Sequence, residues 1–97
     1  MPTDARLAEA QQAFEDGQRL KESGRSGEAL PLAERALELR EAVYGRTHPE
    51  VAACLELLGS VLTLQGEHSR AETLLHRSLA IREETLGKRH IAVAALL

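Results

Sequence analysis

Small and apolar residues recur every three or four positions in the second half of the chain. Ala71, Leu74, Leu75, Ser78 and Leu79 follow this spacing, which places them on one stripe of an α-helix. A stripe of the same phase occurs earlier in the chain and consists of Ala29, Leu32, Ala33, Ala36 and Leu37. We therefore predict helices over residues 26–44 and 69–86 that pack in the same way.

The two stripes are 42 residues apart, and the same step relates many other positions. It carries Gly45 onto Gly87, His48 onto His90, and the residues 51–53 onto 93–95, which both read Val-Ala-Ala. Self-similarity at a fixed step is the signature of a repeat array. We expect one domain over residues 1–97, with one unit at about 4–45, a second at about 46–87 and a truncated third at 88–97.

Four glycines one helix length apart are expected to end helices, because glycine readily takes the left-handed conformation that closes a C-terminus. They are Gly24, Gly45, Gly66 and Gly87. Four breaks predict five helices, at about 4–23, 26–44, 49–65, 69–86 and 91–97, each antiparallel to the next across a short connection. The expected fold is all-α, with stacked helix-turn-helix units.

Several residues refine these predicted helix ends and crossings. Thr47 and Glu50 have the spacing of a capping box, and Pro49 suits a first helical turn. Pro31 lies inside the second predicted helix, where its missing amide proton is expected to distort or delay the first turn. Glycine inside a helix is unfavourable, so we expect Gly17 and Gly59 to allow close contact with small partners, Ala29 and Ala71 respectively.

Composition narrows the classes of function. The chain has 97 residues, 43% hydrophobic and 28% charged, with a formal net charge of -3. Acidic and basic residues are mixed, which argues against nucleic acid and anionic membranes as partners. No apolar run approaches the roughly 18 residues of a membrane span. The single Cys54 fits a core position in a reducing compartment, so we expect a cytoplasmic protein.

The repeated unit resembles the tetratricopeptide repeat, in the 42-residue form found in kinesin light chains. The second helix of that family follows the pattern aromatic-x-E-A-E-x-L-aromatic-x-R-A-L-x-I, and residues 68–81 read H-S-R-A-E-T-L-L-H-R-S-L-A-I. The family linker L-G-x-x-H-P-x-V-A is matched at residues 44–52, which read Y-G-R-T-H-P-E-V-A, and again at 86–94. The resemblance implies a right-handed α-solenoid of about two and a half repeats, with the first helices lining a concave groove.

The same resemblance implies where a partner would bind. Groove-facing positions of the family's first helix correspond here to Gln11, Phe14, Gln18, Lys21, Ala53, Glu56, Ser60 and Thr63. Phe14 suits an aromatic anchor for a partner, or equally a residue that packs against a neighbouring helix of the same chain. The asparagine pair of the kinesin-light-chain type is replaced by Glu56 and Leu57, so no known ligand carries over.

No pattern in the chain predicts catalysis or a cofactor. His48 and His90 occupy matching helix starts one unit apart, which favours a structural role over metal binding. His68 and His76 are two helical turns apart, too far to share one zinc ion. The glycines are isolated, so no phosphate-binding loop is present, and no nucleophile has a recognisable base. We expect no catalytic residue, metal or cofactor.

Two functions remain after these exclusions. The first is a protein-interaction module that holds a peptide or protein in the groove, within a larger protein. The second is a structural spacer or self-association module without a dedicated ligand. Residues 91–97 match only the opening of a first helix, so we expect an uncapped last unit and homo-oligomers that form through this C-terminal helix.

Overall fold

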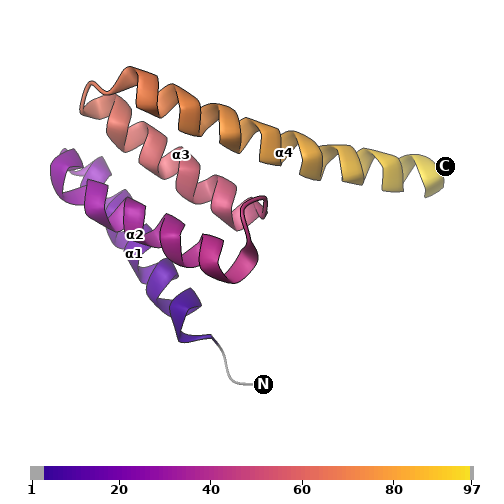
Figure 1. Cartoon of the computed structure of the whole chain (residues 1–97), viewed down its shortest axis with the longest axis horizontal. Helices are drawn as coiled ribbons and strands as arrows, with labels where there is room; N and C mark the ends of the chain where they lie inside the picture. The colour runs from indigo at the N-terminus through magenta and orange to yellow at the C-terminus, as the bar shows by residue number, and fades with distance from the viewer. Residues whose placement is uncertain (1–3, 97) are drawn as a thin grey trace.

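The computed structural model describes residues 4–96, with side chains placed for residues 4–87. Four helices follow one another, α1 (Ala5–Glu22), α2 (Ser26–Tyr44), α3 (Pro49–Leu64) and α4 (His68–Leu96), and no strand occurs in this part of the chain (Figure 1). The predicted all-α class is confirmed. The helices form two antiparallel pairs, α1 with α2 and α3 with α4, and the second pair is stacked on the first.

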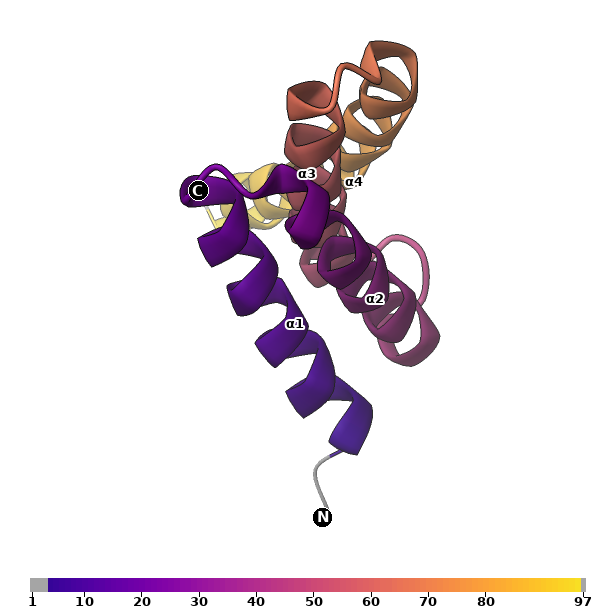
Figure 2. The ribbon, with the colours of Figure 1, turned by 90° about the vertical axis from the view of Figure 1, so that its left-hand side faces the viewer.

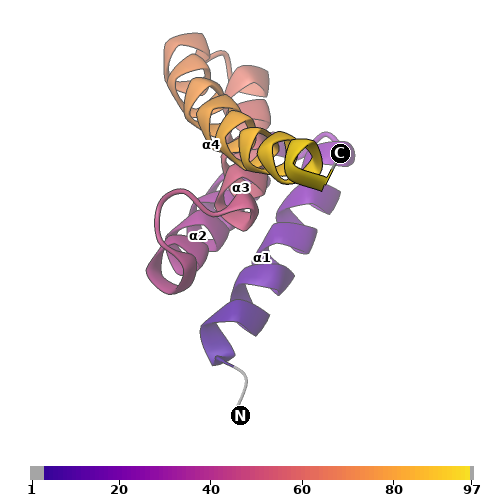
Figure 3. The same ribbon diagram turned by 90° about the vertical axis from the view of Figure 1, so that its right-hand side faces the viewer.

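The stack has two unlike sides. The Cα traces of α1 and α3 come within 8 Å of each other, whereas over the described residues those of α2 and α4 do not. Figures 2 and 3 view the stack from two opposite sides and show the second pair rotated against the first. The first helices of the two units are therefore close on one side, and the second helices diverge on the other.

Helix α3 forms the centre of the core because it is apolar on all sides except the one that carries Glu56 and Ser60. Val51, Leu55, Val61 and Leu62 have no exposed side-chain surface, and Leu58 is 3% exposed. A helix that is hydrophobic on most sides is stable in water only when neighbours cover it. Here α2 covers one side of α3 and α4 covers the other, so both units depend on this helix.

Three of the four predicted glycine breaks are confirmed. Gly24, Gly45 and Gly66 have φ values of 81°, 86° and 83°. After two of them the backbone closes in the same way, with the Arg25 amide donating to the Leu20 carbonyl at 2.8 Å and the Glu67 amide donating to the Leu62 carbonyl at 2.9 Å. These bonds satisfy carbonyls that would otherwise be orphaned at the helix ends.

The fourth predicted break is wrong, and the chain has four helices where five were expected. Helix α4 continues through Gly87 to Leu96, and the φ of Gly87 is not positive. Glycine permits a left-handed turn but does not require one. After Gly45, Pro49 forces the preceding residue out of the helical region. The matching position after Gly87 is Ile91, which continues a helix without a steric clash.

Two details of the predicted helix starts are also corrected. His48, not Thr47, is the N-cap of α3, and its Nδ1 accepts a hydrogen bond from the Glu50 amide at 3.0 Å. Pro49 occupies the first turn as predicted, and it holds His48 extended with φ −79° and ψ 144°. Pro31 does not delay α2, which begins at Ser26; the proline lies on the exposed side of the helix.

Replacing His48 by alanine should lower the free energy of unfolding by about 1 kcal/mol, the usual effect of losing an N-cap. The variant also loses the stacked contact between the His48 and Tyr44 rings, whose centroids are 4.0 Å apart. Urea denaturation of both proteins measures the difference. His48→Asn, which keeps an acceptor at the N-cap, should recover most of the loss, and equal loss in both variants would contradict the capping role.

The two glycines inside helices meet different neighbours. A Cβ atom on Gly17 would lie 3.6 Å from the Ala29 carbonyl oxygen, so Gly17 faces Ala29 as predicted. A Cβ atom on Gly59 would lie 2.8 Å from Leu75 Cγ and Cδ2. Leu75, rather than the predicted Ala71, therefore approaches Gly59 most closely, because its side chain lies over the glycine where α4 crosses α3.

Candidate partner-binding groove

Six of the eight predicted groove residues surround one hollow on the side formed by α1 and α3. The hollow has a volume of about 170 Å³ and is lined by Phe14, Gln18, Lys21, Ala53, Glu56 and Ser60, together with Leu57. On each helix the lining positions recur at intervals of three or four, so they share one face. The hollow combines an apolar surface with polar and charged groups of both signs.

Gln11 and Thr63 lie outside this hollow and are bonded within the chain. The Gln11 side-chain amide donates to Glu15 Oε1 at 2.9 Å, and its oxygen accepts from Arg40 Nη2 at 2.7 Å. The Thr63 hydroxyl donates to the Gly59 carbonyl at 2.9 Å. Both residues occupy the predicted helices, one turn beyond the residues that line the hollow.

Phe14 contributes both to the core and to the surface of the hollow. It is half-buried and packs against the core clusters that contain Ala13, Leu57 and Cys54. The rest of its side chain lines the hollow. Phe14 therefore belongs to the internal packing and also supplies the groove with aromatic surface.

Arg40 joins three helices, and its burial was not predicted from the sequence. Its side chain is 4% exposed and lies where α1, α2 and α3 meet. Nη1 lies 3.3 Å from Cys54 Sγ and 3.4 Å from the Glu50 carbonyl oxygen, and the guanidinium carbon lies 4.8 Å from the centre of the Phe14 ring. The burial of Arg40 could have been predicted from the sequence, because position 40 lies four residues after Ala36 and so continues the apolar stripe of α2.

One period later the same two positions form a different contact. Arg82 matches Arg40 and Glu56 matches Phe14, so a cation stacked on a ring is replaced by an ion pair. Arg82 Nε lies 2.9 Å and Nη2 lies 3.2 Å from the two Glu56 carboxylate oxygens. Ser78 Oγ lies 2.6 Å from the same carboxylate. The wall of the groove at Glu56 is therefore held by α4.

These contacts change the acidity of Glu56. The hydrogen-bonded Arg82 guanidinium lowers the pKa of the carboxyl group, partial burial opposes this effect, and the Ser78 hydroxyl adds to the lowering. A carboxyl group whose pKa is lower in the folded state binds fewer protons there than in the unfolded chain. Its stabilising contribution is therefore present above the unfolded pKa, about 4.3 for Glu, and is lost as the pH falls through the folded value.

Glu56→Gln should accordingly flatten the loss of stability on acidification. Between about pH 5 and pH 3 the free energy of unfolding should fall less steeply in the variant than in the parent protein, because the lowered carboxyl group is gone. The side chain is 45% exposed, so the difference should be about 0.5 kcal/mol or less. Urea denaturation at a series of pH values measures it, and parallel curves would contradict the assigned pKa shift.

Cys54 is buried and free, as expected for a core residue, and burial raises the pKa of its thiol. No group of three or more His, Cys, Asp or Glu residues that could hold a metal ion occurs in the described part of the chain. Among the same residues, no helix combines the length and the apolarity that crossing a bilayer requires.

Antiparallel helix pairs stacked with a 42-residue period define a helical-repeat protein, here with a hollow between its first helices. The family model for the tetratricopeptide repeat matches residues 20–84, and the chain belongs to that family. Two clustered mitochondria protein homologs, from Xenopus tropicalis and Danio rerio, are each 38% identical to this chain over 58 residues. That alignment covers 60% of this chain and 4% of each relative. The chain thus matches a small part of much longer proteins.

Proposed function

We propose that this chain is a protein-interaction module that holds a peptide or a protein segment in the groove of α1 and α3. The observation that carries the proposal is the gathering of Phe14, Lys21 and Glu56, with their neighbours, around one hollow. Tetratricopeptide repeats generally mediate contacts between proteins. The groove provides surface for binding, and no residue in it has the arrangement of a nucleophile with its base.

The groove suits an extended segment with at least one apolar side chain. Phe14 and Leu57 offer apolar area, and the amide of Gln18 and the hydroxyl of Ser60 can bond a peptide backbone. The net charge of -3 does not favour nucleic acid or an anionic membrane. A free buried thiol fits a reducing compartment, so we place the module in the cytoplasm.

A displayed library of random peptides tests this proposal, because the natural partner is not needed. Peptides selected on the parent protein should shift the amide NMR signals of α1 and α3. Gln18→Arg, which places a long side chain across the hollow, should weaken their binding at least tenfold. Gln12→Arg is the matched control, because Gln12 is an exposed glutamine of α1 outside the hollow.

Equal binding to both glutamine variants would contradict the groove as the binding site. A library that yields no peptide above background on the parent protein would contradict the module as a peptide binder. Either result would favour the second candidate function.

The second candidate function is self-association through α4. Leu79 is 55% exposed and Leu86 is 53% exposed, whereas Leu37, one period before Leu79, is half-buried against α3. We infer that a second copy covers this face of α4. Sedimentation over a range of concentrations should show a rising average mass that Leu79→Gln lowers. Leu64→Gln, at a 61% exposed position on α3, is the control, and a constant monomer mass would contradict self-association.

A further inference from the structure

A second and larger hollow lies between α2 and α4, on the side of the stack away from the groove. Its volume is about 430 Å³, and each of three helices contributes a leucine to its apolar surface, namely Leu37, Leu58 and Leu74. Leu58 is nearly buried, whereas Leu37 and Leu74 are half-buried. The hollow exists because α2 and α4 diverge and leave α3 as its floor.

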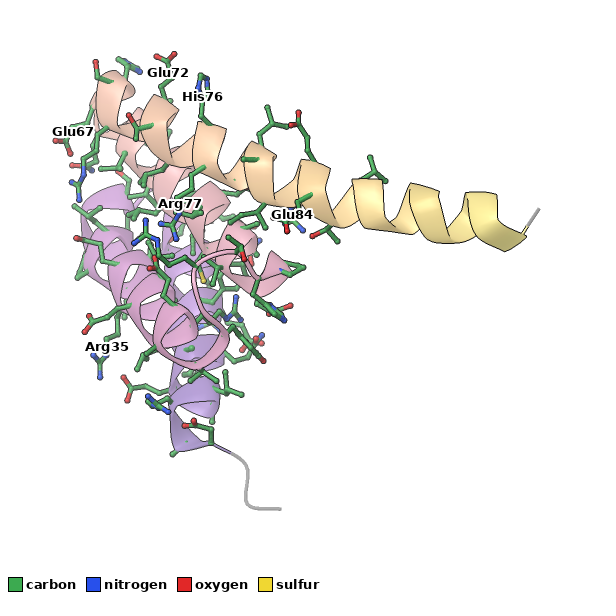
Figure 4. All side chains as sticks on the ribbon, turned by 45° about the vertical axis from the view of Figure 1, so that its right-hand side comes forward. Arg35, Glu67, Glu72, His76, Arg77 and Glu84 are labelled. Carbon is green, nitrogen blue, oxygen red and sulfur yellow. The ribbon has the colours of Figure 1, made fainter. Side chains whose placement is uncertain are left out.

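Two ion pairs span the space between α2 and α4. Arg70 Nη2 lies 3.7 Å from Glu34 Oε2, and Arg77 Nη1 lies 3.2 Å from Glu41 Oε1. Figure 4 labels Arg77, which extends from α4 toward α2. Because Glu34 and Glu41 are two turns apart on α2, the pairs mark two ends of the hollow, and the leucines lie between them.

Glu38 lies between these two ends on the rim. It is one turn from Glu34 and one turn from Glu41, and its side chain is 73% exposed. It pairs with Arg35 of the same helix at 3.6 Å, and Arg35 also donates to Glu9 Oε2 at 2.7 Å. Over the described residues, α4 places no ion-pair partner opposite Glu38. The middle of the hollow thus has one carboxylate above an apolar floor.

Glu34 and Glu41 join α2 to α4, whereas Glu38 joins no two helices within the described part of the chain. Three glutamates and one arginine line the hollow. Glu34 pairs with Arg70, and Glu41 pairs with Arg77 and Arg46. Glu38 is therefore the rim carboxylate that remains for an added cation.

One period later the corresponding positions hold His76, Ala80 and Glu83, so the second unit does not repeat the row. Like charges one turn apart also destabilise a helix slightly. Glu38, which joins no two of the described helices and is replaced by Ala80 one period later, fits a role in recognition.

We propose that this hollow binds a lysine or arginine side chain from a basic segment of a protein partner. Such side chains lay an aliphatic stem along apolar surface and keep the charged end in water. The stem would lie over Leu37, Leu58 and Leu74, and the charged end would meet Glu38. Charge complementarity therefore selects the occupant, and the apolar floor favours a long side chain. The site is separate from the groove, and the proposal does not depend on the groove.

Tetralysine is a suitable probe, and NMR titration of the full chain measures its binding. Amide signals of residues 34–41 and 70–77 should shift, while those facing the α1 and α3 groove should not. Tetra-acetyl-lysine, which keeps the stems without the charges, should bind at least threefold more weakly. A tetrapeptide of diaminopropionic acid, which keeps the charges on short stems, should also bind at least threefold more weakly, because it cannot reach the leucines.

Glu38→Gln should weaken tetralysine binding about threefold or more. Glu72→Gln is the matched control, since Glu72 is a 70% exposed glutamate of α4 that does not line the hollow. Equal effects of the two variants would overturn the site, as would equal binding of the acetylated or short-stem peptides. Shifts confined to the α1 and α3 groove would also overturn it, without contradicting the groove's own role.

Discussion

Replacing Leu62 by alanine is expected to lower the free energy of unfolding by about 3 kcal/mol. Leu62 has no exposed surface and belongs to the cluster with Ala33, Leu58 and Ala71, which joins α2, α3 and α4. Deleting a buried leucine side chain removes its transfer free energy and leaves a cavity that neighbours fill only in part. Thermal unfolding should show a midpoint lower by more than 10 °C, since each kcal/mol shifts a domain of this size by roughly 4–8 °C.

The matched control for this prediction lies two residues further along the same helix. Leu64 is 61% exposed, so Leu64→Ala should change the free energy of unfolding by about 0.5 kcal/mol or less. Both substitutions remove the same side-chain atoms from α3. A similar loss in the two variants would mean that α3 is not the centre of the core.

Replacing Arg40 by alanine is expected to cost about 2–4 kcal/mol, through a cavity and through lost hydrogen bonds. The guanidinium joins Gln11 of α1 to Glu50 and Cys54 of α3, so its removal loosens the junction of three helices. Glu50 is 49% exposed and lies 3.5 Å from Arg40. The Glu50 carboxylate keeps contact with water, so the variant does not leave a buried charge without a partner.

Two further variants separate the effects of packing and charge at this position. Arg40→Met fills much of the same space without hydrogen bonds and should recover about half of the loss if packing and bonding contribute equally. Arg82→Ala is the control, because Arg82 is the same residue type one period later and is 46% exposed. Its cost should be about 1 kcal/mol or less. Equal losses at positions 40 and 82 would contradict the central role of Arg40. Denaturant unfolding measures all three.

The regular parts of the fold were predictable from the sequence because they depend on local rules. The start of α2 at Ser26 and the start of α3 at Pro49 follow from spacing, glycine turns and proline geometry. The continuation of α4 through Gly87 was not predictable from glycine alone. Whether a glycine turns the chain depends on what the following segment packs against, and Ile91 lacks the steric restriction that Pro49 imposes.

The sequence could predict which residues share a helix face in the candidate groove, but not the contacts between helices that hold them there. Repeat spacing brought Phe14 and Glu56 to the same side, and the structure places both on one hollow. Sequence reasoning could not show that Arg82 and Ser78 hold Glu56, since these contacts join residues 22 and 26 positions apart. The burial of Arg40 was missed because arginine is ordinarily exposed.

Leu57 and Leu58 are consecutive in α3, yet Leu57 lines the hollow beside α1 and Leu58 lines the hollow beside α4. The partition between the two hollows is thus a single helix thick. Side chains at these neighbouring positions share one turn of backbone, so an alteration at either is transmitted to both surfaces. A substitution intended for one surface must therefore be assayed on the other as well.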